Sequence, residues 1–281
     1  MQTNIRTLGP REAQVVLTLS EQGREMLTTA EAIEILGSVG SARNVVQGLV
    51  QKGWLTRLVG GRYLFLPPER GPENLGENNA LALASAVVEE SYVGWWAAAS
   101  FHGLTTQRPS TIAVAVLRHR VTREIEGATI RFVMIGSRKF FGFEDFDVFG
   151  RSVTLSTGAK TIVDCVDRPD LCGGPAELAR IVYGGIAVVD PAELVADALR
   201  MESIALVQRL GFLTDFVGWK LGDDLRGRLR GAVPPSARSP FGRPHRREGD
   251  IGYVRDWGLF VHARRDDLLA DIPQLAHEPA A

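Results

Sequence analysis

The sequence predicts an α+β protein, in which an N-terminal winged helix-turn-helix is followed by a larger mixed α/β domain. Three stretches of helical periodicity and then two short strands around a glycine pair fill the first seventy residues. Strand-like and helical stretches follow. With 281 residues, 45% of them hydrophobic, the chain is long enough for two domains with their own cores. A stretch rich in Pro and Gly places the boundary between residues 1–70 and 71–281.

The three helices of the first domain follow from apolar spacing and capping residues. Residues 10–21 have the helical pattern of the first. Thr28 or Thr29 offers a hydroxyl N-cap for a short second helix, and Glu31 is placed for a capping box. After a tight turn, the third helix is predicted to begin at Ser41, and its apolar stripe is expected to pack on the other two helices.

The opposite face of the third helix is polar. It presents Ser41, Arg43, Asn44, Gln47 and Gln51. These side chains donate hydrogen bonds to phosphates and base edges, and they cluster in the part of a recognition helix that enters the major groove. We therefore predict that these five residues contact DNA.

A β-hairpin wing is predicted after the third helix. Two short apolar strands flank Gly60 and Gly61, a pair that tolerates positive φ in a tight turn. Arg57 and Arg62 lie beside the tip, where they are expected to reach backbone phosphate or the minor groove. The alternative is a small helical domain that mediates only protein contacts, because fold alone does not establish function.

Charge is unevenly distributed, although the net charge is only −1. Residues 226–265 contain ten arginines and three acids, whereas residues 164–224 are acidic on balance. Such a basic stretch favours contact with an anionic polymer, or else forms an exposed face or mobile loop. The first interpretation predicts further DNA contacts at Arg228, Arg230, Arg243, Arg246 and Arg247.

The second domain is predicted to mix strands and helices. Helices are expected at 80–90 and from about 92–95 to 103, followed by strands at 112–117, 129–135 and 153–155. Further helices are expected at 160–166, 175–183, 191–199 and 203–213.

Several segments of the second domain resemble AbiEi-type antitoxins, the antitoxin half of type IV toxin-antitoxin systems. The first runs from Tyr92 through Trp95 and Trp96 to His102-Gly103-Leu104. The others are Lys160-Thr161 to Cys165 with Arg168-Pro169 and Gly173-Gly174, then Arg209 to Leu213, and then Asp256-Trp257-Gly258-Leu259. The sequence departs from the family pattern at Ala159, where an acidic residue is expected before the lysine.

The resemblance implies an antitoxin that represses its own operon. In this family the winged domain binds double-stranded DNA at repeats in the promoter. The C-terminal domain neutralises a nucleotidyltransferase-like toxin, and no stable complex with that toxin is expected. A stand-alone winged-helix transcription factor is the alternative.

A nuclease is the enzyme hypothesis to weigh against this. Glu144, Asp145 and Asp147 with Lys160 loosely resemble the carboxylates and lysine that hold Mg²⁺ in restriction-type enzymes. However, Gly158 stands where a metal-binding acid is needed, so the acids are better interpreted as a solvated turn.

No catalytic residue, metal site or cofactor is predicted. His102 is interpreted as a core or capping histidine, since no nucleophile with an adjacent base is apparent. Cys165 and Cys172 match neither a disulfide framework nor a zinc spacing, and we expect both to be buried. The protein is therefore predicted not to be an enzyme.

The sequence also predicts a cytoplasmic protein. Apolar runs such as 112–117 and 186–189 are far shorter than the roughly 20 residues that a membrane-spanning helix needs. Residues 1–11 are polar where a signal peptide is apolar.

Overall fold

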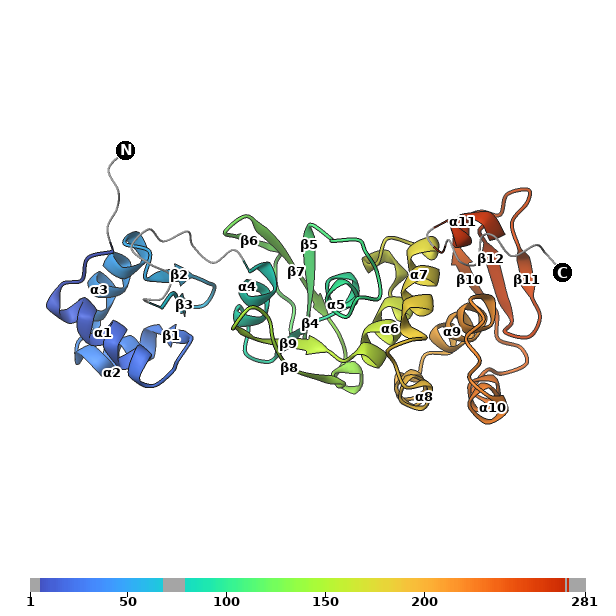
Figure 1. The fold of residues 1–281 in the computed structure, drawn as a ribbon, viewed down its shortest axis with the longest axis horizontal. Helices are drawn as coiled ribbons and strands as arrows, with labels where there is room; N and C mark the ends of the chain where they lie inside the picture. The colour runs from blue at the N-terminus through green and yellow to red at the C-terminus, as the bar shows by residue number, and fades with distance from the viewer. Residues whose placement is uncertain (1–5, 68–78, 271, 273–281) are drawn as a thin grey trace. The chain divides into compact units, whose positions relative to one another are not determined.

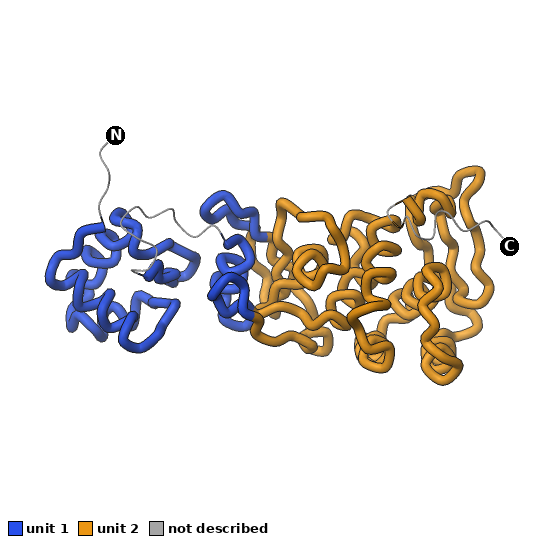
Figure 2. Tube along the Cα trace, in the orientation of Figure 1, with its two compact units in different colours: residues 1–90, 122–130, 147–153 blue, residues 91–121, 131–146, 154–281 orange. Residues whose placement is uncertain are grey.

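A computed structural model describes residues 6–67, 79–270 and 272. The chain divides into two compact units (Figure 2). The first unit comprises Met1–Glu90, Thr122–Ile130 and Asp147–Val153, and the second unit comprises the remaining residues. The predicted domain boundary at residue 70, and the predicted linker beyond Pro67, lie outside the described residues.

The N-terminal part of the first unit contains three helices and a three-stranded antiparallel sheet (Figure 1). The elements are α1 (Pro10–Glu21), β1 (Met26–Thr28), α2 (Thr29–Leu36), α3 (Val39–Gln51), β2 (Leu55–Arg57) and β3 (Arg62–Phe65). The strands are ordered β1-β3-β2. This arrangement is consistent with the predicted winged helix-turn-helix, with β1 as an additional strand.

Capping residues define where α2 and α3 begin. Thr28 caps α2: its hydroxyl accepts from the Glu31 N–H at 3.2 Å, while the Glu31 carboxylate accepts from the Thr28 N–H at 2.7 Å. The predicted start of α3 at Ser41 was wrong by two residues. Ser38 is the N-cap and accepts from the Ser41 N–H at 3.4 Å, so the helix begins at Val39.

The core of this part lies between the three helices and the hairpin. Helix α3 contributes Ala42, Val46 and Leu49, which lie on one face because they are four and three residues apart. Trp54, which follows α3, is 7% exposed and lies under the Arg6 guanidinium, 3.8 Å from the ring centroid. Burying one face of α3 leaves its polar face exposed.

A six-stranded mixed sheet forms the middle of the chain, in the order β6-β7-β5-β4-β9-β8. Its strands are β4 (Ser91–Val93), β5 (Thr111–Val116), β6 (Arg123–Ile125), β7 (Ala128–Met134), β8 (Phe143–Asp147) and β9 (Ser152–Ser156). Strand β4 pairs antiparallel with β5 and parallel with β9. The strands predicted at 112–117, 129–135 and 153–155 are confirmed as β5, β7 and β9.

The helix predicted to start between Tyr92 and Trp95 is confirmed as α5, which begins at Trp95, while Tyr92 lies in β4. The φ of Trp95, +54°, is unusual for a bulky residue. The predicted turn was wrong, because Glu144, Asp145 and Asp147 lie in β8. Charged side chains suit this strand because it is at the edge of the sheet.

Helices and a small second sheet complete the chain. The helices are α4 (Ala80–Ala86), α5 (Trp95–Phe101), α6 (Gly158–Asp167), α7 (Pro175–Gly185), α8 (Pro191–Arg200), α9 (Ile204–Phe216), α10 (Asp223–Gly231) and α11 (Arg265–Leu269). The sheet has the order β10-β12-β11, from β10 (Ser239–Gly242), β11 (Gly252–Val254) and β12 (Leu259–His262). The predicted α+β class is confirmed. Among the described residues, no helix is long and apolar enough to cross a bilayer.

Candidate functional site

A groove of about 730 Å³ lies between α3 and the hairpin of the first unit. The hairpin tip is held at the start of α2, because the Thr29 N–H and hydroxyl both donate to the Gly61 carbonyl, at 2.8 and 3.1 Å. Gly60 and Gly61 have φ of +67° and +72°, so the predicted turn chemistry is confirmed. The wing is thereby fixed relative to the helix-turn-helix.

The groove is cationic. Its lining residues are Thr29, Val39, Ala42, Arg43, Val46, Gln47, Val50, Gln51, Arg57, Gly61 and Tyr63. They include two arginines, and no carboxylate is among these described residues. Ala42, Val46 and Tyr63 are buried. Arg43, Gln47, Gln51 and Arg57 are exposed. An anionic ligand placed here would meet hydrogen-bond donors without charge repulsion.

The structure brings some of the predicted DNA contacts together and separates others. Arg43, Gln47, Gln51 and Arg57 share the groove, and Asn44 is exposed on α3 next to it. The Ser41 hydroxyl accepts a hydrogen bond from Arg11 of α1. Arg62 is turned to Glu89, with which it forms an ion pair.

Arg11 was missed by the sequence analysis. It adds a third positive charge beside the N-terminal end of α3, through its contact with Ser41. The two residues are 30 positions apart in the chain, so no local pattern indicates that they meet.

The five C-terminal arginines do not form one patch. Arg228 and Arg230 lie on α10, which precedes β10, whereas Arg243, Arg246 and Arg247 follow the C-terminal end of β10. Arg243 pairs with Asp267 of α11, and Figure 1 shows α10 and α11 at opposite ends of the sheet β10-β12-β11. Arg243 forms ion pairs with Asp250 and Asp267, whereas Arg246 and Arg247 are exposed.

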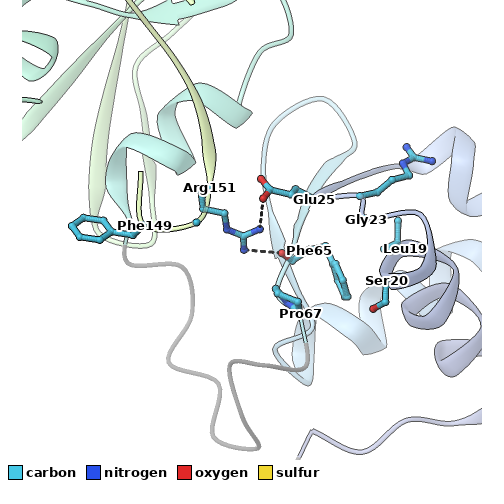
Figure 3. A pocket seen from close by; sticks show the side chains of 10 residues that line it. Leu19, Ser20, Gly23, Glu25, Phe65, Pro67, Phe149 and Arg151 are labelled. Carbon is cyan, nitrogen blue, oxygen red and sulfur yellow. Dashed lines mark hydrogen bonds and ion pairs between the residues drawn. The ribbon is translucent and has the colours of Figure 1, made fainter. Parts of the chain in front are cut away.

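A second hollow of the first unit, of about 380 Å³, is lined by the end of α1 and the loop between β8 and β9 (Figure 3). Arg151 of this loop is 5% exposed. It donates to the Phe65 carbonyl at 2.9 Å and lies 3.5 Å from the Glu25 carboxylate. Phe149 points away from these groups and is 93% exposed. The Arg151 guanidinium is therefore used to hold the loop.

A buried charged cluster lies inside the second unit. Lys160 of α6 is 0% exposed and Asp164, one turn later, is 3% exposed. The Lys160 ammonium donates to the Asp164 carboxylate and, at 3.0 Å, to the Tyr92 hydroxyl. That hydroxyl donates to the second Asp164 oxygen at 3.0 Å, which closes a triangle. Phe141 covers the ammonium, with its ring centroid 4.9 Å away.

Burial controls the ionisation of this cluster. It raises the pKa of Asp164, and Lys160 opposes this shift by stabilising the carboxylate. Burial also raises the pKa of the Tyr92 phenol well above its ordinary value, and the neighbouring Asp164 adds to that shift. Tyr92 therefore remains a proton donor to the carboxylate. The cluster is a satisfied network, and Lys160 is engaged within it, which leaves the β8 acids without the lysine that the nuclease hypothesis needs.

Hydrogen bonds also tie helix α5 to α7 and β9. Glu177 of α7, 5% exposed, accepts from Trp96 Nε1 at 2.9 Å and from the Thr105 hydroxyl. The His102 ring is bonded to the Ser156 carbonyl at 2.7 Å, and burial lowers the pKa of this histidine. His102 is also the C-cap residue of α5, as the capping interpretation predicts.

Glycines allow the remaining segments to pack on aromatic rings. A β-carbon on Gly173 would stand 3.0 Å from the Trp96 ring, and one on Gly211 would overlap the Trp257 ring. Next to Gly211, Gln208 donates to the Gly258 carbonyl at 3.0 Å. The segments that resembled the antitoxin family therefore meet one another inside the second unit.

Ala159, Cys165 and Cys172 are buried in the same core. Both cysteines are free thiols, and both are buried, as predicted. Ala159 is 1% exposed, which accounts for an apolar side chain at this position. Within the described ranges, no group of three or more His, Cys, Asp or Glu side chains is arranged to hold a metal ion.

Comparison with known proteins identifies the segment that contains most of this core. Residues 92–216 match the family described as AbiEi antitoxin C-terminal domain. The predicted resemblance is confirmed. The fold is similar to the crystal structure of the RV2827C protein from Mycobacterium tuberculosis, with a TM-score of 0.66 and 18% identity over 95% of this chain and 96% of that chain. No curated protein sequence matches the chain.

The antitoxin match and the packing agree. Three of the four segments named from the sequence lie within residues 92–216, and the fourth, around Trp257, packs on Gly211 inside that range. The match supports an antitoxin role for the chain.

Proposed function

We propose that this antitoxin represses its own operon by binding double-stranded DNA through α3 and the wing. The observation that supports this most is the cationic groove, where Arg43, Gln47 and Arg57 converge from two elements. Helix α3 is thirteen residues long, and its polar N-terminal half is exposed, as insertion into a major groove requires. Arg57 lies on β2, the edge strand of the wing, where it is suited to a backbone phosphate.

The two kinds of contact should have different effects when they are removed. Gln47→Ala is expected to weaken binding to a promoter duplex by about 1–3 kcal/mol and to random duplex much less, because Gln47 reads base edges. Arg57→Ala is expected to weaken both equally and to reduce the log-log salt slope by about 1, because it contacts phosphate. Arg62 stays a predicted phosphate contact that has to leave Glu89 to act.

Fluorescence anisotropy of labelled promoter and random duplexes tests this division. Gln22→Ala, an exposed glutamine at the end of α1, is the matched control for Gln47, and exposed Arg108 of the second unit is the control for Arg57. Equal losses on both duplexes for Gln47→Ala, or losses as large for the controls, would contradict base reading by α3. Failure of the unaltered protein to bind duplex at low salt would favour a winged domain that contacts only proteins.

The C-terminal arginines are proposed to add duplex contacts. Changing Arg228, Arg230, Arg243, Arg246 and Arg247 to Ala removes five charges, and each lost phosphate contact should flatten the salt slope by about 0.9. Because the arginines lie at two ends of the small sheet, we expect the two groups to act separately. An unchanged slope in the fivefold variant would show that these residues are only solvated.

The toxin partner is proposed to be a nucleotidyltransferase-like protein that the C-terminal domain neutralises without a stable complex. The family match of residues 92–216 supports this part of the proposal. Growth rescue on co-expression with the toxin, together with the absence of a co-eluting complex in gel filtration, is the expected result.

A further inference from the structure

The small C-terminal sheet has one buried and one exposed face. On its central strand β12, Leu259 and Val261 are 0% exposed, whereas Phe260 between them is 41% exposed. Phe260 is in register with Tyr253 of β11, which is 42% exposed, and with Pro240 of β10. Because residues directly opposite one another project from the same face, these three form a row across the exposed side.

The two rings of this row lie against each other. Their centroids are 4.9 Å apart, with an interplanar angle of 39°. Two adjacent exposed rings form a small apolar patch, which is the kind of surface that a ligand with flat apolar groups can stack on. The row lies outside residues 92–216, so the antitoxin match assigns it no role.

Arginines flank the aromatic row. The Arg238 guanidinium lies over the Tyr253 ring, 5.2 Å from its centroid, and is held there by hydrogen bonds to the Pro235 and Ala237 carbonyls at 2.9 and 2.7 Å. Arg255, two residues after Tyr253, is exposed. The face therefore combines aromatic rings with positive charge.

Two of the nearby acids are already paired. Asp250 forms an ion pair with Arg243, and Asp256 lies 3.4 Å from Arg226. Each of these arginines is shared with a second acid, Asp267 for Arg243 and Asp215 for Arg226. Arg238 and Arg255 take part in none of these four ion pairs, so their charges are available to a ligand. Positive charge beside exposed rings favours an anionic ligand that also has flat, apolar groups.

We propose that this face binds single-stranded nucleic acid, with bases stacked on Tyr253 and Phe260 and phosphates held by Arg238 and Arg255. Unpaired bases expose the π-faces that stack on aromatic side chains, whereas a duplex hides them between base pairs. RNA and single-stranded DNA share this chemistry. This site is separate from the α3 groove, so the proposal of single-strand binding does not depend on the proposal of duplex binding by α3.

The test measures binding of the full chain to labelled oligonucleotides of about 12 nucleotides. The probes are oligo(U), oligo(dT) and a duplex of the same length. Combined Tyr253→Ala and Phe260→Ala is expected to weaken binding to the single strands about tenfold or more and to leave the salt slope unchanged, because stacking releases no counterions. Arg238→Gln and Arg255→Gln should each flatten that slope by about 0.7.

Three further variants distinguish loss of stacking from loss of folding and from non-specific binding. Tyr253→Phe with Phe260→Tyr keeps both rings and should retain affinity. Phe149→Ala removes a ring that is 93% exposed in the first unit and should have no effect on the single strands. Arg57→Ala should weaken duplex binding only. Circular dichroism and thermal melting verify that each variant is folded.

Specific outcomes overturn the proposal. One is that the unaltered chain fails to bind either single strand at low salt. Another is that the folded double-alanine variant binds as tightly as the parent. If that variant keeps single-strand affinity but loses growth rescue against the toxin, the face docks a protein instead. A preference for oligo(U) over oligo(dT) would identify RNA as the ligand.

Discussion

Gly211 of α9 lies flat against the indole ring of Trp257. A β-carbon at position 211 would overlap three atoms of that ring, which is 1% exposed and whose Nε1 donates to Asp215 at 2.8 Å. Asp215 lies one turn beyond Gly211 on the same helix. The ring is therefore fixed both by the absence of a side chain and by a hydrogen bond, and this joins α9 to the turn before β12.

Gly211→Ala is expected to destabilise the protein by about 1–3 kcal/mol, because the added methyl group overpacks a filled core. Urea denaturation measures the change. Gly227→Ala is the matched control, since Gly227 lies within α10 and a β-carbon there meets no atom within 4 Å. That substitution should stabilise by about 0.5–1 kcal/mol. If both substitutions change the free energy of unfolding in the same direction, overpacking against Trp257 is not the cause.

The Lys160–Asp164 pair gives a second prediction. Lys160→Met leaves a buried carboxylate without its cation, and we expect a loss of about 3–5 kcal/mol. Adding Asp164→Leu should recover part of that loss, because it removes the unpaired carboxylate, whereas the buried Tyr92 hydroxyl then loses its acceptor. Chemical denaturation of the three proteins at neutral pH measures both steps. If the double variant is less stable than Lys160→Met, the ion pair is not the source of the cost.

Much of the fold could be predicted because its signals are local. The periodicity of α1 and α3, the capping box at Thr28 and the Gly60-Gly61 turn all depend on neighbours in the sequence. Strands β1 and β4 could not be predicted in this way, because three residues are too few to show alternation and, unlike β2, neither strand leads into a glycine turn of a hairpin.

The site was predicted less completely, because partners distant in the sequence decide which side chains are available. Arg57 and Arg62 look equivalent beside the hairpin tip, yet Arg57 lines the groove and Arg62 pairs with Glu89. In the same way, the sequence singles out Lys160 as part of a family segment and as a possible nuclease lysine, but not as half of a buried ion pair. Only the fold brings it to Tyr92, 68 residues earlier.

A third prediction concerns acid sensitivity of the first unit. Burial raises the pKa of Glu12, but hydrogen bonds from Lys52, at 2.6 Å, and from the Gly9 N–H, at 2.7 Å, outweigh it and hold that pKa below 4.5. Because the folded-state pKa is depressed, the stabilisation is present above pH 4.5 and is lost as the pH decreases through the folded-state value.

Glu12→Gln should therefore lower stability at neutral pH by about 1 kcal/mol and flatten its decline in acid. Thermal melts between neutral pH and acid check this. Glu34→Gln, on the exposed face of α2, is the control and should follow the parent curve. If the stability of Glu12→Gln declines in acid as steeply as that of the parent, the acid sensitivity comes from other groups.

The last prediction is that the two proposed functions, repression and neutralisation, are separable. A fragment starting near Glu73 lacks α3 and the wing, and should lose promoter binding. It should still fold, because the large core cluster consists only of residues from Tyr92 to Ile272. The fragment gives up the partners of Arg151, the Phe65 carbonyl and Glu25, so we expect a local loss of stability at the β8–β9 loop. Growth rescue of cells expressing the partner toxin is the deciding measurement, after circular dichroism has verified the fold.

Full-length Arg57→Ala provides the complementary test: it should rescue growth while losing promoter affinity. A folded fragment that gives no rescue would show that neutralisation needs the winged part as well.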